Sequence, residues 1–316
     1  GISESEITNL EPLWALKLPD SNRLRSQPAL AGGLLFIGSH SGGVYAFDQK
    51  SGCQVWHFKT AGEVRTGIAV DSWKAGNSSA EPQIYFGDAI GNVYAVKARS
   101  GKLVWRDRAD KHPNATITGA PALHDGVLYT PVSSLEVQLA VNPYYECCTG
   151  RGSVVAYEAL TGKRKWKTFT IPEEPTVQYV NEAGTDMYGP SGSTVWNSPT
   201  IDVHRNQLYV GTGENMSSPA DHTSDAVFAI DLTTGEVNWI YQATVGDAWN
   251  TACDTRTPQS CPEENGPDFD FGAGTMLVTT DSNRQLVVAG QKSGDVHAVD
   301  PDTGELVWKT RVGRGG

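Results

Sequence analysis

The 316-residue sequence lacks the features that mark several large classes of protein. No apolar run approaches the ~20 residues that a transmembrane helix needs, and residues 1–20 lack the charged start and apolar middle of a signal peptide. We therefore expect no membrane insertion, and a chain that is either cytoplasmic or already processed. With 25 Lys and Arg against 36 Asp and Glu, the net charge of −11 offers no basic face for a nucleic acid or an anionic membrane surface.

Cysteine is scarce, at five residues, and no CxxCH haem-attachment motif is present. Cys147 and Cys148 are adjacent, and Cys253 and Cys261 close the loop CDTRTPQSC. Both pairs favour disulfides over metal ligands, which points to an oxidising compartment. A bond between Cys147 and Cys148 closes a small ring unlike an ordinary disulfide, so long-range bridges or free thiols remain alternatives. Cys53 is left over and is interpreted as structural.

What the sequence does contain is a repeat with the pattern A-x5-[ST]-G-x3-W. It occurs five times with identical internal spacing: VYAFDQKSGCQVW, VYAVKARSGKLVW, VVAYEALTGKRKW, VFAIDLTTGEVNW and VHAVDPDTGELVW, ending at Trp56, Trp105, Trp166, Trp239 and Trp308. Each copy predicts an alternating strand, a turn whose Ser/Thr-Gly pair supplies a positive φ, and a second strand ending in a large aromatic residue. The unit is therefore a β-hairpin.

Further strand-like runs precede each hairpin: GGLLFIGSH, QIYFGDAIG, GVLYTPVSS, NQLYVGTGE and QLVVAGQKSG. Each repeat thus offers about four short strands, which is the content of a propeller blade. Successive repeat tryptophans stand 49, 61, 73 and 69 residues apart, whereas a blade needs only ~40 to 50 residues. The surplus predicts long loops at 137–150, 172–194 and 243–272, where function is expected.

The tryptophan repeat resembles that of the quinoprotein alcohol dehydrogenases, whose propellers carry pyrroloquinoline quinone (PQQ) and a calcium ion. Non-catalytic assembly scaffolds of the bacterial outer membrane carry a similar repeat. PVSSLE, ECCTGRGSVVAY and GPDFDFGAG look most like segments of polyvinyl alcohol dehydrogenases and their relatives. The resemblance implies an all-β fold, a β-propeller of four-stranded blades. Relatives have eight blades and this chain offers about five to six, so we expect a single propeller domain over 1–316 that is incomplete at its C-terminus.

The resemblance also implies roles for residues that bind the metal and the quinone. PVSSLE resembles a segment that ends in a metal-binding glutamate, which implies that role for Glu136. SGSTVWNSPTID resembles the strand whose tryptophan lies under the quinone, and this tryptophan is Trp196. LYVGTGEN resembles a turn that supplies an asparagine to the metal; this points to Asn215, although Glu214 occupies the place where some relatives have that asparagine.

GPDFDFGAG resembles the motif of the catalytic aspartate, with Asp268 favoured as the base over Asp270, and Asp268 also as a metal ligand. AGQKSGDVHAVD implies that Lys292 contacts the reactive carbonyl of the quinone. The softer matches EVRTG and ITGAPAL imply that Arg65 and Thr118 hold the cofactor's carboxylates.

The family likeness extends to the adjacent cysteines and to the metal. It implies that a disulfide between Cys147 and Cys148 covers the face of the quinone opposite Trp196. Two carboxylates two residues apart, as at Asp268 and Asp270, resemble the arrangement in relatives that use a lanthanide, so a lanthanide is an alternative to Ca²⁺.

The expected function is oxidation of a secondary or polymeric alcohol by a PQQ- and calcium-dependent dehydrogenase. We expect it to be periplasmic or secreted and to pass electrons to a cytochrome c. The alternatives are a propeller scaffold that binds partner proteins and a sensor that binds the quinone without turnover; a scaffold needs neither the acids at Glu136 and Asp268 nor adjacent cysteines.

Overall fold

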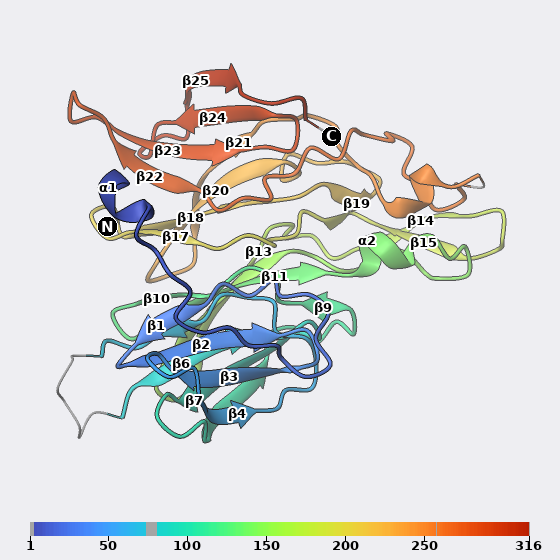
Figure 1. Cartoon of the computed structure of the whole chain (residues 1–316). Coiled ribbons are helices and arrows are strands. Elements are labelled where there is room, and N and C mark those ends of the chain that lie inside the picture. Colours follow the sequence, from blue (N-terminus) through green and yellow to red (C-terminus); the bar gives the residue numbers. More distant parts are fainter. Residues whose placement is uncertain (1–2, 74–80, 257, 316) are drawn as a thin grey trace.

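The computed structural model describes residues 3–73, 81–256 and 258–315, and it is built almost wholly from antiparallel strands. Five sheets with a four-stranded meander each follow one another along the chain. Figure 1 shows them in succession around the molecule, from the blue N-terminal sheet to the red C-terminal one. The predicted propeller of four-stranded blades is confirmed, with five blades in the described residues.

Each blade takes its strands from one continuous stretch of the chain. Blade 1 contains β1 (Ala29–Ala31), β2 (Leu34–Ser39), β3 (Gly43–Asp48) and β4 (Gln54–Phe58). Blade 2 contains β5 (Ala69–Val70), β6 (Gln83–Gly87), β7 (Asn92–Lys97) and β8 (Leu103–Arg108). Blade 3 contains β10 (Ala122–His124), β11 (Val127–Ser134), β12 (Ser153–Glu158) and β13 (Arg164–Phe169), with β9 (Ala115–Thr116) added on β11. Blade 4 contains β17 (Thr200–Asp202), β18 (Gln207–Gly211), β20 (Ala226–Asp231) and β21 (Val237–Gln242). Blade 5 contains β22 (Met276–Thr279), β23 (Gln285–Gly290), β24 (Asp295–Val299) and β25 (Leu306–Arg311).

The repeat motif forms the last hairpin of every blade, as predicted. In blade 1, Ala46 of β3 lies opposite Trp56 of β4, so a small residue faces the large one across the sheet. The turn between them passes through Gly52 at φ +69°, a conformation that glycine adopts without steric cost. The four other hairpins have the same register and the same turn.

The repeat tryptophans also join one blade to the next. The indole of Trp56 donates a hydrogen bond to the carbonyl of Ala98, 2.9 Å away in blade 2, and lies so close to Gly101 that a Cβ there would come within 2.7 Å of the ring. The repeat therefore needs its glycine for two reasons, the turn and the docked indole. The same contact recurs at Trp14 on Gly52, Trp105 on Gly162, Trp166 on Gly235 and Trp239 on Gly304.

The hydrophobic core lies between neighbouring blades. Phe36 and Val44 of blade 1 pack against Ile84 and Phe86 of blade 2, and similar clusters join the later blades. The middle strands are consequently buried on both faces. This stack of sheets is the rigid base from which the long insertions project.

The three predicted long loops contain short elements of their own. The first begins with the helix α2 (Glu136–Leu139), the second forms the hairpin of β14 (Thr176–Val180) and β15 (Asp186–Gly189), and the third includes the 3-10 helix η1 (Thr251–Asp254). The short strands β16 (Ser191–Gly192) and β19 (Asn215–Ser217) pair with each other. Figure 1 shows α2, β14, β15 and β19 at one end of the sheets.

The remaining helix, α1 (Glu4–Ile7), lies near the N-terminus. In the part of the chain that the structure describes, no helix is long and apolar enough to cross a membrane.

Candidate active site

A cavity of about 310 Å³ brings together residues from blades 3, 4 and 5, from the segment between blades 1 and 2, and from the insertions. Six residues singled out in the sequence line it: Arg65, Thr118, Trp196, Asp268, Asp270 and Lys292. Residues 65 and 292 are more than 200 positions apart in the chain, so the fold is what unites them. Its volume suits a small organic ligand.

Trp196 provides a flat aromatic wall of this cavity. It lies in the segment between β16 and β17, and the outer edge of its indole rests on Gly272, where a Cβ would come within 2.3 Å of the ring. The next residue, Asn197, is buried and donates hydrogen bonds to the carbonyls of Gly211 and Phe271 at 2.8 and 2.7 Å. The indole is therefore supported by the protein through Gly272 and through the hydrogen bonds of Asn197.

Asp270 is held by three donors from three parts of the chain. Its Oδ2 accepts from Nε1 of Trp196 at 3.1 Å and lies 2.8 Å from Nζ of Lys292, while its Oδ1 accepts from the backbone N–H of Glu214 at 2.9 Å. Donors directed at a carboxylate from several sides fix its orientation. Asp270 thus connects the tryptophan, the lysine and the glutamate segment.

Asp268 lies nearby but is held less firmly. Its Oδ1 is 2.7 Å from Nζ of Lys292, and the side chain is 26% exposed. Burial and the neighbouring charge of Asp270 raise the pKa of Asp268 to about 6, although Lys292 opposes this shift. Burial alone would lower the pKa of Lys292, but Asp270 and Asp268 outweigh that effect and raise it, so the lysine stays charged. Its ammonium lies 5.6 Å from the centre of the Trp196 ring.

Glu214 completes a group of three acids with Asp268 and Asp270. One oxygen of each lies within 4.8 Å of the others. Glu214 is 6% exposed, and burial together with the charges of Asp270 and Asp268 raises its pKa well above the ordinary value. Among the ion pairs of the described residues, none includes Glu214. A buried acid in this setting needs either a proton or a cation.

The donor set of this acid group fits a hard cation. All three side chains offer carboxylate oxygens, which Ca²⁺ and similar ions prefer, and neither histidine nor cysteine belongs to the group. The cavity also fits a polar aromatic ligand, because it combines the Trp196 face with a cationic side chain, Arg65, and with the hydroxyl of Thr116. That hydroxyl is buried and has no hydrogen-bond partner among the described residues.

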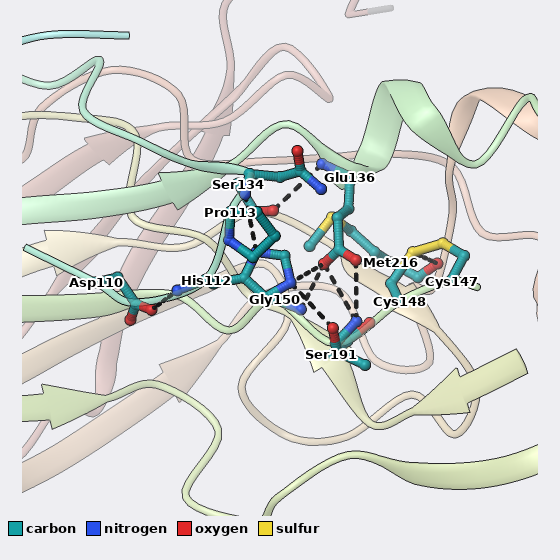
Figure 2. A network of polar contacts seen from close by, with 12 residues as sticks. Asp110, His112, Pro113, Ser134, Glu136, Cys147, Cys148, Gly150, Ser191 and Met216 are labelled. Atoms are coloured by element: carbon teal, nitrogen blue, oxygen red, sulfur yellow. Dashed lines mark hydrogen bonds and ion pairs between the residues drawn. A yellow bond between two sulfur atoms is a disulfide. The ribbon is translucent and has the colours of Figure 1, made fainter. Parts of the chain in front are cut away.

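Glu136 lies outside this group of acids, in a polar network that Figure 2 shows. Its side chain is fully buried and accepts hydrogen bonds from the Tyr145 hydroxyl at 2.8 Å, from the backbone N–H of Thr149 at 3.1 Å and from that of Gly150. Nε2 of His112 lies 3.5 Å from its Oε2. Glu136 is therefore satisfied by protein donors alone, and its role as a metal ligand stays a prediction from the resemblance.

Asn215 also points away from the acids. Its amide donates to the Ser191 carbonyl and to Oγ of Ser193, both at 3.2 Å, and its Oδ1 accepts from the N–H of Asp221 at 2.8 Å. Its neighbour Glu214 is the residue that lines the cavity. Sequence reasoning followed the residue type of the relatives to Asn215, whereas Glu214 occupies the place where some relatives have that asparagine. A metal-binding role for Asn215 stays a prediction.

The two predicted cysteine pairs are both disulfide-bonded, and Cys53 is free and exposed. Cys147 and Cys148 are fully buried and pack in a cluster with Ala140, Met187 and Met216. They are not among the residues that line the cavity. That this disulfide covers the quinone therefore stays a prediction.

Arg65 and Thr118 both line the cavity, as the resemblance implied. The hydroxyl of Thr118 donates to the backbone carbonyl of Trp196 at 3.3 Å, which ties blade 3 to the indole segment. Arg65 is half-buried and forms no ion pair with any described residue, so its guanidinium is available to an anionic ligand. That these two residues hold carboxylates of a cofactor stays a prediction.

Sequence reasoning missed four lining residues that come from the insertions. Val137 and Gln138 of α2 line it together with Trp249 and Thr251, and the Thr251 hydroxyl donates to the Val137 carbonyl at 2.8 Å. Both segments lie in the insertions expected to carry function, but their pairing depends on loop conformations that no repeat pattern specifies.

Comparison with known proteins gives consistent results. The model for the family described as PQQ, "Glucose/ethanol/alcohol dehydrogenase, beta-propeller domain", matches residues 1–259. The whole chain aligns at 39% identity with a polyvinylalcohol dehydrogenase of Pseudomonas sp, of which the alignment covers 49%. The quinohemoprotein alcohol dehydrogenase of Comamonas testosteroni has a similar fold, with a TM-score of 0.68 at 23% identity over 92% of this chain and 43% of that one. A europium-containing methanol dehydrogenase has a TM-score of 0.66 at 19% identity, over 97% of this chain and 54% of that one. The chain spans about half the length of the curated relatives it matches.

Proposed function

Since the chain belongs to the family of PQQ-type glucose, ethanol and alcohol dehydrogenase propeller domains, we propose that the protein oxidises an alcohol with PQQ and a bound metal ion. The observation that carries the proposal is the joining of Trp196, Lys292 and three acids in one cavity. A secondary or polymeric alcohol is the proposed substrate class, because the relative with 39% identity is named a polyvinylalcohol dehydrogenase.

Glu214, Asp268 and Asp270 would hold the metal ion. Their oxygens are already grouped, and burial together with the neighbouring acids raises the pKa of Glu214, so a cation at this position would be favourable. Ca²⁺ suits this all-oxygen set. A lanthanide suits it as well, because three carboxylates can offset a higher charge, and one structural neighbour is named as containing europium. Glu136 and Asn215 remain further ligands by resemblance.

When bound, PQQ would supply a carbonyl carbon that accepts hydride from the alcohol. The residues of this chain position the reaction. Trp196 presents a flat face, and Arg65 and Thr118 would hold the carboxylates of the cofactor. Lys292 would stabilise the negative charge that develops on the quinone. The remaining task is removal of the hydroxyl proton of the alcohol.

We assign that task to Asp268. Both oxygens of Asp270 are engaged by donors, whereas Asp268 has one oxygen on Lys292 and a partly exposed carboxylate. A carboxylate oxygen that no protein donor engages can accept a proton. In turn, Asp270 orients the lysine and the tryptophan. Equal losses of turnover on changing either aspartate to Asn would leave the base unassigned, and a larger loss at Asp270 would reverse it.

The electron acceptor and the location of the protein follow from the same proposal. Reoxidation needs an acceptor, for which a cytochrome c is proposed because related proteins are named quinohemoproteins. The two disulfides support a periplasmic or secreted location.

Titration with PQQ, with and without Ca²⁺, tests the proposal through quenching of tryptophan fluorescence. We expect saturable quenching that depends on the metal and is weakened by Trp196→Phe or Glu214→Gln. Trp166→Phe is the matched control, because Trp166 docks on Gly235 outside the cavity and its loss leaves binding intact. Absence of metal-dependent binding in the wild type would favour the scaffold.

A further inference from the structure

Asp247 is a fully buried acid that neither the sequence motifs nor the family resemblance singled out. It lies between β21 and η1, and it does not line the cavity. Its Oδ1 accepts from the backbone N–H of Asp268 at 3.3 Å and its Oδ2 from that of Phe269 at 3.0 Å. One carboxylate therefore accepts hydrogen bonds from two consecutive amides of the loop that carries Asp268 and Asp270.

The main chain beside Asp247 is tied to the glutamate segment as well. The Asp247 carbonyl accepts from the N–H of Asn215 at 3.1 Å, and the Asn215 carbonyl accepts from the N–H of Trp249 at 2.8 Å. On the other side, the Ala248 carbonyl accepts from the N–H of Gly266 at 2.9 Å. Residues 247–249 thus lie between the strand that follows Glu214 and the loop that carries the two aspartates.

The loop needs this support because of its backbone conformation. Asp268 has φ +57°, in the left-handed region that side chains disfavour. Further along, the N–H of Phe271 donates to the Thr212 carbonyl and the carbonyl of Asp270 accepts from the N–H of Lys292. The amides of Asp268 and Phe269, by contrast, donate to the carboxylate of Asp247. A strained residue persists when its surroundings determine it.

We propose that Asp247 is the positioning residue that sets the two aspartates of the loop against Glu214, so that the affinity of the site for its metal depends on it. This inference rests on the proposed function for the identity of the ligand. Asp247 acts through the backbone and touches neither substrate nor cofactor. Loss of its carboxylate releases the amides of Asp268 and Phe269, and the three acids no longer share one geometry. Outer residues that orient metal ligands typically change affinity by about 10–100-fold.

Gly266 provides a second way to disturb the same contact. A Cβ added there would lie 2.2 Å from Oδ1 and 2.8 Å from Cα of Asp247, so Gly266→Ala displaces the carboxylate and the main chain beside it without removing the acid. Gly266 does not have a positive φ, so alanine at this position meets the contact with Asp247 but no left-handed backbone strain.

Asp225 supplies the matched control. It is also fully buried, and burial with the adjacent Asp247 raises its pKa to about 10, so it is uncharged at neutral pH. Its φ of +48° is one that asparagine tolerates. Asp225→Asn therefore changes a neighbouring buried acid without removing an acceptor from the loop. In Asp247→Asn, the amide nitrogen faces one of the two N–H donors.

The first experiment compares Asp247→Asn, Gly266→Ala and Asp225→Asn in the protein titrated with Ca²⁺ at saturating PQQ. We expect the first two variants to bind Ca²⁺ about tenfold or more weakly and Asp225→Asn to remain within about twofold of wild type. Calcium affinity in Asp247→Asn equal to wild type would overturn the proposal, as would an equal loss in all three variants.

Hydrogen exchange in a peptide covering 266–271 gives a readout that needs neither metal nor quinone. The proposal expects faster exchange in Asp247→Asn than in Asp225→Asn, with an unchanged rate in the strands β12 and β20. Unchanged exchange of the loop sinks the positioning role even if PQQ binds. If the wild type binds no PQQ but the loop exchanges faster in Asp247→Asn, the proposed function fails and the positioning role stands. An exchange rate that rises uniformly over the strands as well would mean general destabilisation, and this would also contradict the positioning role of Asp247.

Discussion

Two buried glutamates, Glu136 and Glu214, show how differently this protein treats the same side chain. Glu136 is enclosed by N–H and O–H donors, from Tyr145, Thr149 and Gly150. Glu214 instead faces the carboxyl groups of Asp268 and Asp270. The donors around Glu136 offset the cost of burying its polar carboxyl group, whereas the acids around Glu214 add to that cost.

The difference separates two uses of a buried acid. An acid whose oxygens all accept hydrogen bonds from the protein links two parts of the chain. Glu136 in this way holds the segment that follows the Cys147–Cys148 disulfide (Figure 2). An acid buried among other acids is destabilised unless a positive charge lies close to it, and a metal ion can supply that charge. The comparison can be tested by changing each side chain in turn.

The largest effect is expected on turnover. Asp268→Asn removes the proposed base, and turnover of a secondary alcohol should fall by about 10²–10⁴-fold. PQQ binding at a saturating metal concentration should fall much less, because Trp196 and Arg65 are untouched. Steady-state kinetics with an artificial electron acceptor, together with the quenching titration, separate these quantities. Turnover close to wild type would show that this acid does not carry the proton transfer.

The next effect is on stability, and it differs between the two glutamates. Glu136→Gln places an amide nitrogen against N–H donors, and the metal-free protein should lose about 1–3 kcal/mol of unfolding free energy. Glu214→Gln should change it little, because the raised pKa of Glu214 already favours its protonated form, which glutamine resembles. Urea denaturation without metal measures both. A greater loss at Glu214 than at Glu136 would invert the comparison.

A pH dependence follows from the raised pKa of Asp268, about 6 in the folded protein. Because that value exceeds the ~3.9 of an unfolded aspartate, the folded state binds the proton more tightly, and this contribution to stability is lost as the pH rises through about 6. Metal-free protein should therefore lose on the order of 2 kcal/mol between pH 4 and pH 7 from this group.

Thermal unfolding of wild type and Asp268→Asn over this range tests that dependence, because the variant should lack this part of the slope. Bound metal should stabilise the wild type more at pH 7.5 than at pH 5, since protons compete with it. Identical pH profiles of wild type and variant would exclude Asp268 as the cause.

The smallest effect is expected at Tyr145. Tyr145→Phe removes one hydroxyl donor from Glu136 but leaves the two amide donors, so unfolding free energy should fall by about 0.5–2 kcal/mol. Hydroxyl loss should leave the fold unchanged. A fall as large as that of Glu136→Gln would mean that the amides contribute little to the network.

The repeat made the blades predictable from sequence. The spacing of alanine, glycine and tryptophan has a local physical cause in each hairpin, so the last two strands of all five blades could be assigned from the residues alone. The strand-like runs predicted the strand before each hairpin, but no pattern located the short first strand of each blade. The same spacing does not reveal that each indole docks on the glycine of the next repeat, because that contact is made between blades.

The site was predictable only in part. Trp196, Asp268, Asp270 and Lys292 were identified through motif resemblance, and the cavity unites them. The environments of Glu136 and Glu214 could not be read from sequence, since both are glutamates in polar loops. Whether donors or acids surround them is decided by contacts with Thr149 and Asp270, 13 and 56 residues away.

The most direct test of the account is a calorimetric titration of metal-free protein with Ca²⁺, and in parallel with a lanthanide, for wild type, Glu214→Gln and Glu136→Gln. We expect one metal site in the wild type, with an affinity that falls at least about tenfold in Glu214→Gln. Metal binding should release more protons from the acids as the pH is lowered toward 6, because Asp268 then carries a proton that the metal displaces. The Glu136→Gln titration decides whether that residue is also a ligand. A wild-type affinity that Glu214→Gln leaves unchanged would contradict the claim that the cavity acids form the metal site.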